Sequence, residues 1–268
     1  DYEHVASLNE QVHQADMYPD AICLRDAPSH GEIARFTGHS DSKLRGAFAR
    51  DAPGLDQRTC ARLLGDPDAD VRDSLAGRDH LPDILIYELA SDPDQMVRAT
   101  VAERADLRQE LVEELARDPY WHVRKNIAGR TDLSGALINE LARDPDGMVR
   151  AGVARRSDIG EELIQEFGRD QDWHVRKCIA GRFEIGQELI HELARDHHWN
   201  VRTTVAGRSD LPAQLIYELA RDRDDQVRDS MAVRDDLPAA PLYELARDPE
   251  DHVRESIAER DDLPAALI

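Results

Sequence analysis

A fixed period of 26 residues constrains the fold of this chain more than any other feature. A Val-Arg pair recurs at that spacing without an insertion, at Val71, Val97, Val123, Val149, Val175, Val201, Val227 and Val253. A period of this length indicates a stack of similar units, each in contact only with its neighbours. Two weaker copies precede the regular ones, LRGAFARDAP from Leu44 and ICLRDAP over residues 22–28.

These copies predict one elongated domain of about ten units. We expect degenerate N-terminal repeats or a cap over residues 1–65, and eight regular repeats over residues 66–268. The last repeat is incomplete, because the chain stops at Ile268 part-way through a unit. The chain also begins without Met, so we expect it to be cut from a longer protein or trimmed to its ordered part.

Each repeat carries two signals for the start of a helix and no signal for a strand. The Asp-Pro pair predicts the first start, with Asp92 as the N-cap and Pro93 at the first helical position. This helix is predicted to run through Val97 to about Arg104. The phrase Asp-Leu-Pro, as at Asp210, predicts a second helix. Two short helices cannot bury their apolar faces alone, so the units must stack.

The repeat D-P-x-x-x-V-R-x-x-V-A-x-R-x-D-L-P-x-x-L-L-x-x-L-A resembles that of the leucine-rich repeat variant family of bacteria. The resemblance covers nearly the whole chain in eight copies in register. It implies a right-handed superhelix of alternating α- and 3₁₀-helices. The Asp-Pro-x-x-x-Val-Arg phrase also looks like the inner helix of HEAT repeats. We therefore expect an all-α, right-handed α-solenoid of α/α or α/3₁₀ repeats, without a β-sheet.

Comparison of the copies separates constant positions from variable ones. An Arg follows every anchor Val, an Ala stands five residues after it, and a second Arg seven residues after it. The second helix of each complete unit carries a Glu, from Glu88 to Glu244. A catalytic group is needed once, whereas these charges recur in every unit. They predict a ladder of ion pairs and cap bonds between neighbouring units, and the small Ala predicts close helix contact.

The candidate binding surface lies where the variable positions become aromatic and basic. All three Trp residues stand two positions before an anchor Val, and two of them are followed four residues later by Lys. Residues 119–204 hold 13 Lys and Arg against 14 Asp and Glu, so most of the net charge of −21 lies outside them. The predicted contact residues are Trp121, His122, Lys125, Asn126, Trp173, His174, Lys177, Trp199, Asn200 and Thr203.

Two interpretations of this surface stay open. The Trp side chains could pack against the next unit, each with a Lys stem lying across its ring. Alternatively, they could anchor a partner on the concave side of the central repeats, with Lys, His and Asn as polar contacts. A variable face on a constant scaffold is where repeat proteins carry recognition.

The chain contains no catalytic sequence motif: it has no phosphate-binding Gly-rich loop, no Gly-x-Ser-x-Gly and no His-Glu-x-x-His. We therefore expect a non-catalytic scaffold that binds a protein or peptide, without a cofactor. An apolar run long enough to cross a membrane is absent from the sequence. Three Cys residues make no disulfide framework, so a reduced, cytoplasmic setting is expected.

The alternatives are single-strand nucleic-acid binding, metal binding, and a repeat platform for an enzyme or metal cluster that lies outside this fragment. Bacterial HEAT-like DNA glycosylases place an Asp one turn after a Trp, but here Lys125, Lys177 and Thr203 occupy that place. The net charge of −21 also opposes phosphate binding, although Trp stacking keeps a single-strand binder possible. Some family members hold an iron–sulfur cluster with four Cys, whereas this N-terminal region has only Cys23 and Cys60.

A zinc site is a further possibility. His174 and Cys178, four residues apart on one predicted helix face, would make half of such a site. His197 and His198 with a neighbour are a second candidate pair. The sequence names no complete set of ligands, and a second pair of donors would have to come from elsewhere in the fold.

Overall fold

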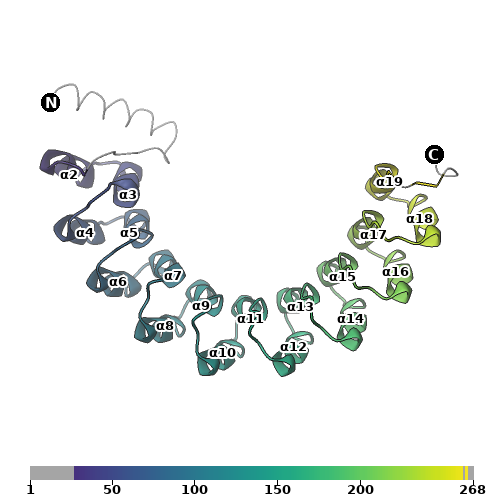
Figure 1. Cartoon of the computed structure of the whole chain (residues 1–268). Coiled ribbons are helices and arrows are strands. Elements are labelled where there is room, and N and C mark those ends of the chain that lie inside the picture. The colour runs from purple at the N-terminus through teal and green to yellow at the C-terminus, as the bar shows by residue number, and fades with distance from the viewer. Residues whose placement is uncertain (1–26, 262, 265–268) are drawn as a thin grey trace. The chain divides into compact units, whose positions relative to one another are not determined.

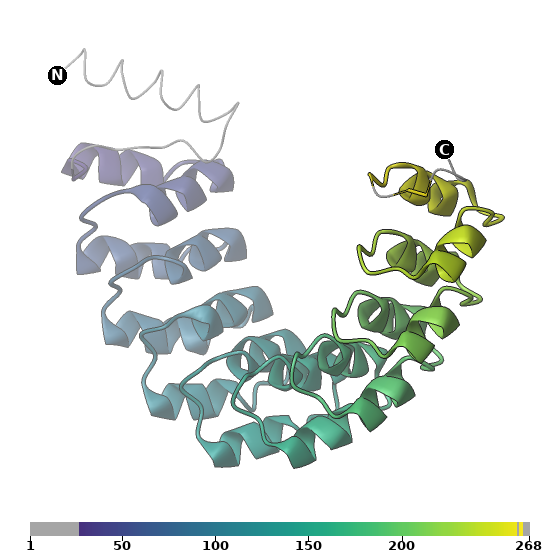
Figure 2. The same cartoon turned by 45° about the vertical axis from the view of Figure 1, so that its right-hand side comes forward.

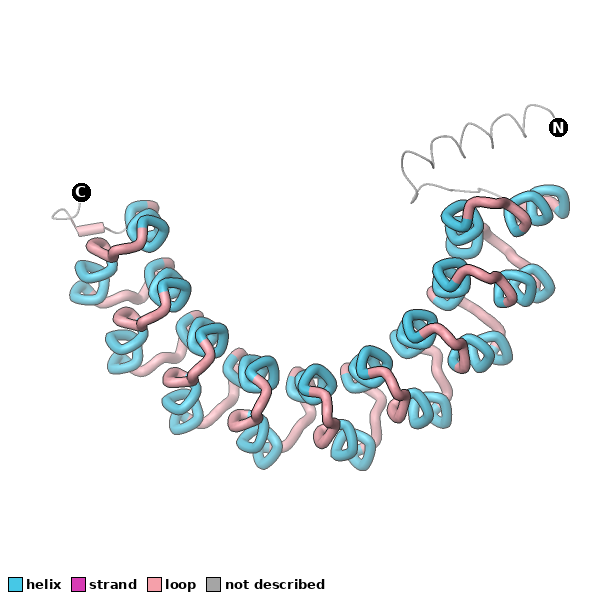
Figure 3. Tube along the Cα trace, turned by 180° about the vertical axis from the view of Figure 1, so that it is seen from behind, coloured by secondary structure: helices cyan, strands magenta, loops and turns pink. Residues whose placement is uncertain are grey.

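The computed structural model describes residues 27–261, 263 and 264. Cys23 and the start of the weak copy over residues 22–28 lie outside them. Within the described residues the chain forms 18 α-helices and neither a strand nor a 3₁₀-helix (Figure 3). The expected all-α repeat fold is therefore confirmed, and both helices of each regular repeat are α. The chain divides into two compact units, up to Leu141 and from Ala142 onward, and each is described separately.

The first unit contains two rows of helices (Figure 1). The first helices of its repeats are α3 (Ser42–Asp51), α5 (Ala69–Ala76), α7 (Gln95–Glu103) and α9 (Trp121–Ala128). The other row comprises α2 (His30–Thr37), α4 (Gln57–Leu64), α6 (Asp83–Ala90), α8 (Gln109–Leu115) and α10 (Gly135–Leu141). Within this unit α3, α5, α7 and α9 pack against one another in succession and against second helices beside them.

The second unit repeats this arrangement, as a turned view also shows (Figure 2). Its first helices are α11 (Gly147–Ala154), α13 (Trp173–Ala180), α15 (Trp199–Ala206), α17 (Asp225–Ala232) and α19 (Asp251–Ala258). Its second helices are α12 (Glu161–Phe167), α14 (Gln187–Leu193), α16 (Ala213–Leu219) and α18 (Ala239–Leu245). The predicted right-handed superhelix concerns both units together and stays a prediction, as does the single domain.

A thin apolar core runs between the two rows of each unit. The anchor Val of every regular repeat is fully buried, and so is the residue four positions later, as in Val175 and Ile179. Those two positions lie on one face of the first helix. Leu189 and Leu193 of α14 cover that face from the second row. The constant Ala, such as Ala180, is also fully buried, as its predicted role in close helix contact requires.

The predicted N-cap is wrong, because the first helix begins two residues later than the Asp-Pro pair. In α7 the cap is Asp94, whose side chain accepts a hydrogen bond from the Met96 N–H at 2.7 Å. Asp92 instead accepts the Asp94 N–H at 2.8 Å and binds Arg72 of the preceding repeat. A buried carboxylate is stabilised more by a guanidinium than by helix N–H groups alone, so Asp92 belongs to the ladder between repeats.

The predicted ladder is confirmed by these ion pairs. Most of the Arg residues that follow an anchor Val span two repeats. In Arg176, Nη1 donates to the Asp170 carbonyl at 2.7 Å, while Nε and Nη2 donate to Asp196 at 2.5 and 2.8 Å. The described pairs of this kind are Arg45–Asp66, Arg72–Asp92, Arg98–Asp118, Arg150–Asp170, Arg176–Asp196, Arg202–Asp222 and Arg228–Asp248. Each pair ties one repeat to the next.

The second-helix Glu residues form a separate, exposed row of pairs. Arg117 binds Glu140, Arg169 binds Glu192, Arg195 binds Glu218 and Arg221 binds Glu244, each across one repeat boundary. Exposed pairs of this kind contribute little to stability individually. Among the described residues, no helix is both long and apolar enough to cross a bilayer.

Candidate functional site

Three of the predicted contact residues lie together at a cavity of about 690 Å³ in the second unit. Trp173, His174 and Lys177 reach it from α13. The other walls come from the loops that follow α11 and α13, so the cavity lies between two successive repeats. Its lining residues are Arg155, Ser157, Trp173, His174, Lys177, Cys178, Gly181, Arg182, Phe183 and Glu184.

A column of alternating imidazole and indole rings crosses the boundary between the repeat that contains Trp173 and the repeat that follows it. The centroid of Trp173 lies 3.7 Å from that of His174 and 4.1 Å from that of His198. Two imidazoles this close to one indole centre cannot share a face without overlapping, so they cover opposite faces. His198 continues the column to Trp199, at 6.2 Å. Trp173 therefore packs against the next repeat, as the first interpretation of the Trp positions predicted.

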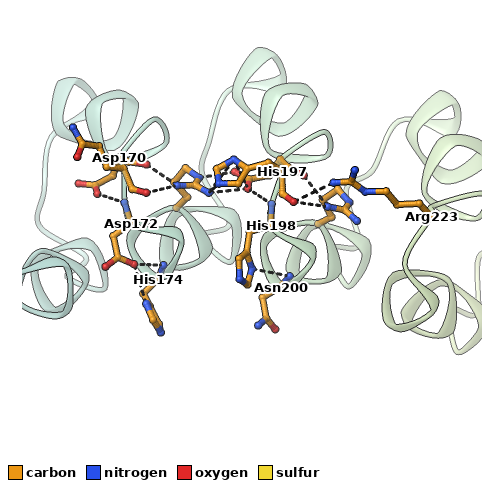
Figure 4. Close-up of polar contacts among 11 residues, drawn as sticks. Asp170, Asp172, His174, His197, His198, Asn200 and Arg223 are labelled. Carbon is orange, nitrogen blue, oxygen red and sulfur yellow. Dashed lines mark hydrogen bonds and ion pairs between the residues drawn. The ribbon is translucent and has the colours of Figure 1, made fainter.

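Asp172 holds one end of this column. It caps α13 by accepting the His174 N–H at 2.9 Å, and the same oxygen lies 2.9 Å from His174 Nδ1 (Figure 4). Burial acts to raise the pKa of Asp172, but the hydrogen bonds from the backbone and ring of His174 hold that pKa below its ordinary value. The carboxylate thus stays charged and orients the imidazole that covers one face of Trp173.

His198 occupies the cap position of α15, where most repeats carry an acidic residue. Its Nδ1 accepts the Asn200 N–H at 3.3 Å, which requires that nitrogen to be unprotonated (Figure 4). Burial lowers the pKa of His198, the charge of Asp196 opposes this effect, and the charge of Arg176 acts in the same direction as burial. The fold therefore favours the neutral imidazole.

This cap predicts a pH-dependent stability between neutral and mildly acid solution. The pKa of His198 is lower in the fold than the ordinary value of about 6.5 that it regains on unfolding. The unfolded chain then binds more protons, so the contribution of His198 is complete above that value and is lost as the pH falls toward the folded pKa. Denaturant titrations from pH 8 to pH 5, on the order of that window, should show this loss in the wild type.

The control is His198→Asn, which keeps a capping side chain without a titrating ring. The free energy of unfolding of this variant should vary less over the same pH range. An equal dependence in both proteins would assign the titration to other groups. The pKa of His198 can be measured directly by NMR, and a value at or above the ordinary one would contradict the prediction.

In the first unit, the predicted contact residues of α9 are engaged mainly with their own repeat and the preceding one. Trp121 stacks on His122 at 3.9 Å, and Lys125 Nζ lies 6.0 Å from its ring centroid. Asn126 Nδ2 donates to the Ala99 carbonyl and to Glu103, both at 3.0 Å. These four side chains are half-buried, and none of them lines the 690 Å³ cavity.

The predicted residues of α15 also lie outside the 690 Å³ cavity. Trp199 is 38% exposed at the end of the ring column. Asn200 receives a hydrogen bond from Thr204 on its carbonyl, and Thr203 Oγ1 is buried without a hydrogen-bond partner among the described residues. Trp121 and Trp199 belong to separate units, so the predicted continuous surface from residue 121 to residue 203 stays a prediction.

The candidate zinc ligands are occupied by other contacts. His174 Nδ1 faces Asp172. His197 lies against Arg176, and its Nε2 is 3.2 Å from Nη2 of that Arg. Burial raises the pKa of the Cys178 thiol, which disfavours the thiolate that a metal needs. Among the residues that the structure describes, no group of three or more His, Cys, Asp or Glu side chains could hold a metal ion.

Sequence reasoning missed six residues of the cavity: Arg155, Ser157, Gly181, Arg182, Phe183 and Glu184. A signal for two of them was available in the repeat. The position of Phe183 holds a small or acidic residue in the other regular repeats, and that of Glu184 holds Asp in six of the other seven. Phe183 is 90% exposed. Both residues lie in the loop after α13, outside the first helix that carries the other variable positions.

One solved structure is similar to this chain over most of its length. It is described as "a leucine-rich repeat variant with a novel repetitive protein structural motif", and it is 29% identical, with a TM-score of 0.58. The match covers 83% of this chain and 88% of that one. The Escherichia coli protein YibA matches at 17% identity and a TM-score of 0.43, over 87% of this chain and 93% of its own. No family model and no curated protein match.

Proposed function

Since the chain belongs to the leucine-rich repeat variant family, we propose that it is a non-catalytic repeat scaffold. Its partner is a protein or peptide, bound on the side of the central repeats that the first helices form. The observation that carries this proposal is the 690 Å³ cavity, to which Trp173, His174 and Lys177 all contribute. Most constant charges of the repeat are engaged within the stack, whereas the cavity is built from positions that vary, apart from the constant Arg182.

The electrostatics of the cavity support recognition of a partner of opposite charge. Arg155, Lys177 and Arg182 line it, against the single carboxylate of Glu184. The side chains of Arg155 and Lys177 form no hydrogen bond or ion pair with any described residue. Unpaired cations beside exposed aromatic surface are typical of recognition sites, and they are unusual in a chain with a net charge of −21.

Nucleic-acid binding is the second candidate, because Arg and Trp side chains both bind single strands. One observation favours a peptide instead. Both faces of Trp173 are covered by His174 and His198, so a base has no face of that indole on which to stack. A labelled oligonucleotide at low salt is the direct comparison.

The test is selection of peptides from a random display library on the immobilised chain, followed by measurement of their affinities in solution. Lys177→Glu should weaken the selected peptides by about tenfold or more, as expected for loss of one charged contact in a partly desolvated site. Lys43→Glu, on α3 in the first unit, makes the same charge change away from the cavity and should leave affinity unchanged. Failure to select any peptide, or equal affinity for both variants, would reject the proposed function.

A further inference from the structure

A guanidinium–carboxylate unit closes the loop after the first helix in most repeats. The Arg seven residues after the anchor Val donates from Nε and Nη2 to both oxygens of the Asp two residues later. In Arg104 these bonds to Asp106 are 2.9 and 2.8 Å long. The same geometry recurs in Arg130–Asp132, Arg156–Asp158, Arg208–Asp210 and Arg234–Asp236.

Arg182 retains half of this unit and lacks the other half. Its Nη1 donates to the carbonyls of Ala154 and Arg156, at 3.1 and 2.5 Å, as in the other repeats. The residue two positions later is Glu184, and no carboxylate among the described residues bonds to Nε or Nη2 of Arg182. The side chain of Glu184 is one methylene longer than that of the Asp found at this position in most other repeats. The result is a bidentate donor without its acceptor.

This donor lies at the cavity of the second unit, where Arg182 is one of the lining residues. Arg155 and Lys177 add two cations beside it, and Trp173 and the exposed Phe183 add aromatic surface. Arg binds carboxylates through two parallel N–H···O bonds, which gives both affinity and direction. The cavity therefore presents a donor for one oxyanion, further positive charge and an apolar wall.

A second cavity at the equivalent place in the first unit has the opposite charge. It measures about 420 Å³ and is lined by Gly77, Asp79, His80, Thr100, Glu103, Arg104, Ala105 and Asp106. There Arg104 is occupied by Asp106, and the remaining lining carries two further carboxylates and no Lys or Arg. The cation excess is therefore a property of the two repeats that supply Arg155, Lys177 and Arg182, and the fold alone does not produce it.

We propose that the cavity binds an acidic peptide segment, with one Asp or Glu side chain of the partner on Nε and Nη2 of Arg182. The bound carboxylate occupies the place that Asp106 occupies on Arg104. A second acidic side chain contacts Lys177 and Arg155, and an apolar residue between them packs on Phe183. This inference rests on the proposed function, because it names the ligand class of the same site.

The experiment compares two short fluorescein-labelled peptides by fluorescence polarisation. In one peptide Asp and Glu residues flank a single Leu, and in the other they are replaced by Asn and Gln. The wild type should bind the acidic peptide at least about tenfold more tightly, the size expected for a bidentate charged contact. Equal affinity for the two peptides would overturn the inference.

Glu184→Asp is the discriminating variant, because it changes no charge and introduces the residue that six other repeats carry. Its carboxylate should occupy Arg182 from within the chain, so the acidic peptide should bind about tenfold more weakly. Phe183→Ser should also weaken binding, since it removes the apolar wall, and Lys43→Glu should not. Unchanged affinity in Glu184→Asp would overturn the assignment to Arg182.

The two proposals fail in different ways. In one outcome, peptides from the display library bind the wild type and Glu184→Asp equally but bind Lys177→Glu more weakly. This result would support the proposed function and overturn the present inference. A chain that selects no peptide and binds neither labelled probe would reject both. Protection of Cys178, which lines the cavity, from alkylation by the acidic peptide would place the bound probe at this site.

Discussion

Replacing Asp196 by Asn should lower the free energy of unfolding by about 3 to 5 kcal/mol, as expected when one member of a buried ion pair is removed. Asp196 and Arg176 are both about 6% exposed at their side chains. Arg176 donates to both oxygens of Asp196, and the His198 N–H donates to one of them at 2.8 Å. The substitution would leave Arg176 as a buried charge without a carboxylate partner.

The same kind of substitution in the exposed row of ion pairs should lower the free energy of unfolding much less than in the buried ladder. Glu218→Gln removes the partner of Arg195, in a pair whose side chains are 52% and 35% exposed. That change should cost less than about 1 kcal/mol, because water screens exposed charges and solvates the remaining Arg. Urea titrations of the two variants at neutral pH measure both values. Similar losses would show that the buried pairs do not hold the repeats together.

Burial acts to raise the pKa of Asp196, but the bonds from Arg176 and from the His198 backbone hold that pKa below its ordinary value. Its stabilising contribution should therefore be complete above the unfolded pKa of about 3.9 and be lost as the pH falls through the folded value. This loss lies below the range in which His198 titrates. Asp196→Asn should accordingly reduce acid sensitivity below about pH 4. Because the Asp196 charge opposes the lowering of the His198 pKa, the same substitution should lower that pKa further and strengthen the pH dependence that His198 contributes.

The repeat period was sufficient to predict an all-α stack, because apolar anchors at one spacing require every unit to present the same face. It also predicted that the constant charges are structural, since a group present in every unit cannot be a single active site. It did not identify which carboxylate Arg176 binds. Asp196 lies twenty residues later, and the pairing depends on how closely successive first helices approach, which one repeat alone does not determine.

The candidate site was less predictable because its residues act through neighbours in the next repeat. Trp121, Trp173 and Trp199 share one position, yet their surroundings differ with the residue that caps the following helix. His198 supplies a flat ring to Trp173, whereas the cap after Trp199 is Asp224. The unpaired donor of Arg182 follows a loop change as small as Asp to Glu at residue 184, and the sequence alone does not show that these two residues would otherwise pair.

These differences predict unequal effects for two Trp substitutions that look equivalent in the sequence. Trp173→Ala should lower the free energy of unfolding by about 2 to 3 kcal/mol, since it removes a half-buried indole packed between two imidazoles. Trp199→Ala should cost less than about 1 kcal/mol, because that ring is 38% exposed at the end of the column. Denaturant titrations of both variants test the difference.

A second readout distinguishes loss of this contact from a general loss of packing. Without the indole, His198 loses the burial that lowers its pKa, so that pKa should rise toward its ordinary value in Trp173→Ala and change less in Trp199→Ala. Equal stability losses with an unchanged His198 pKa would reject the ring column as a contact between repeats. Because Trp173 contributes to both the column and the cavity, the charge substitution at Lys177 is the cleaner test of binding, and the Trp173 variant is the test of how the two repeats are joined.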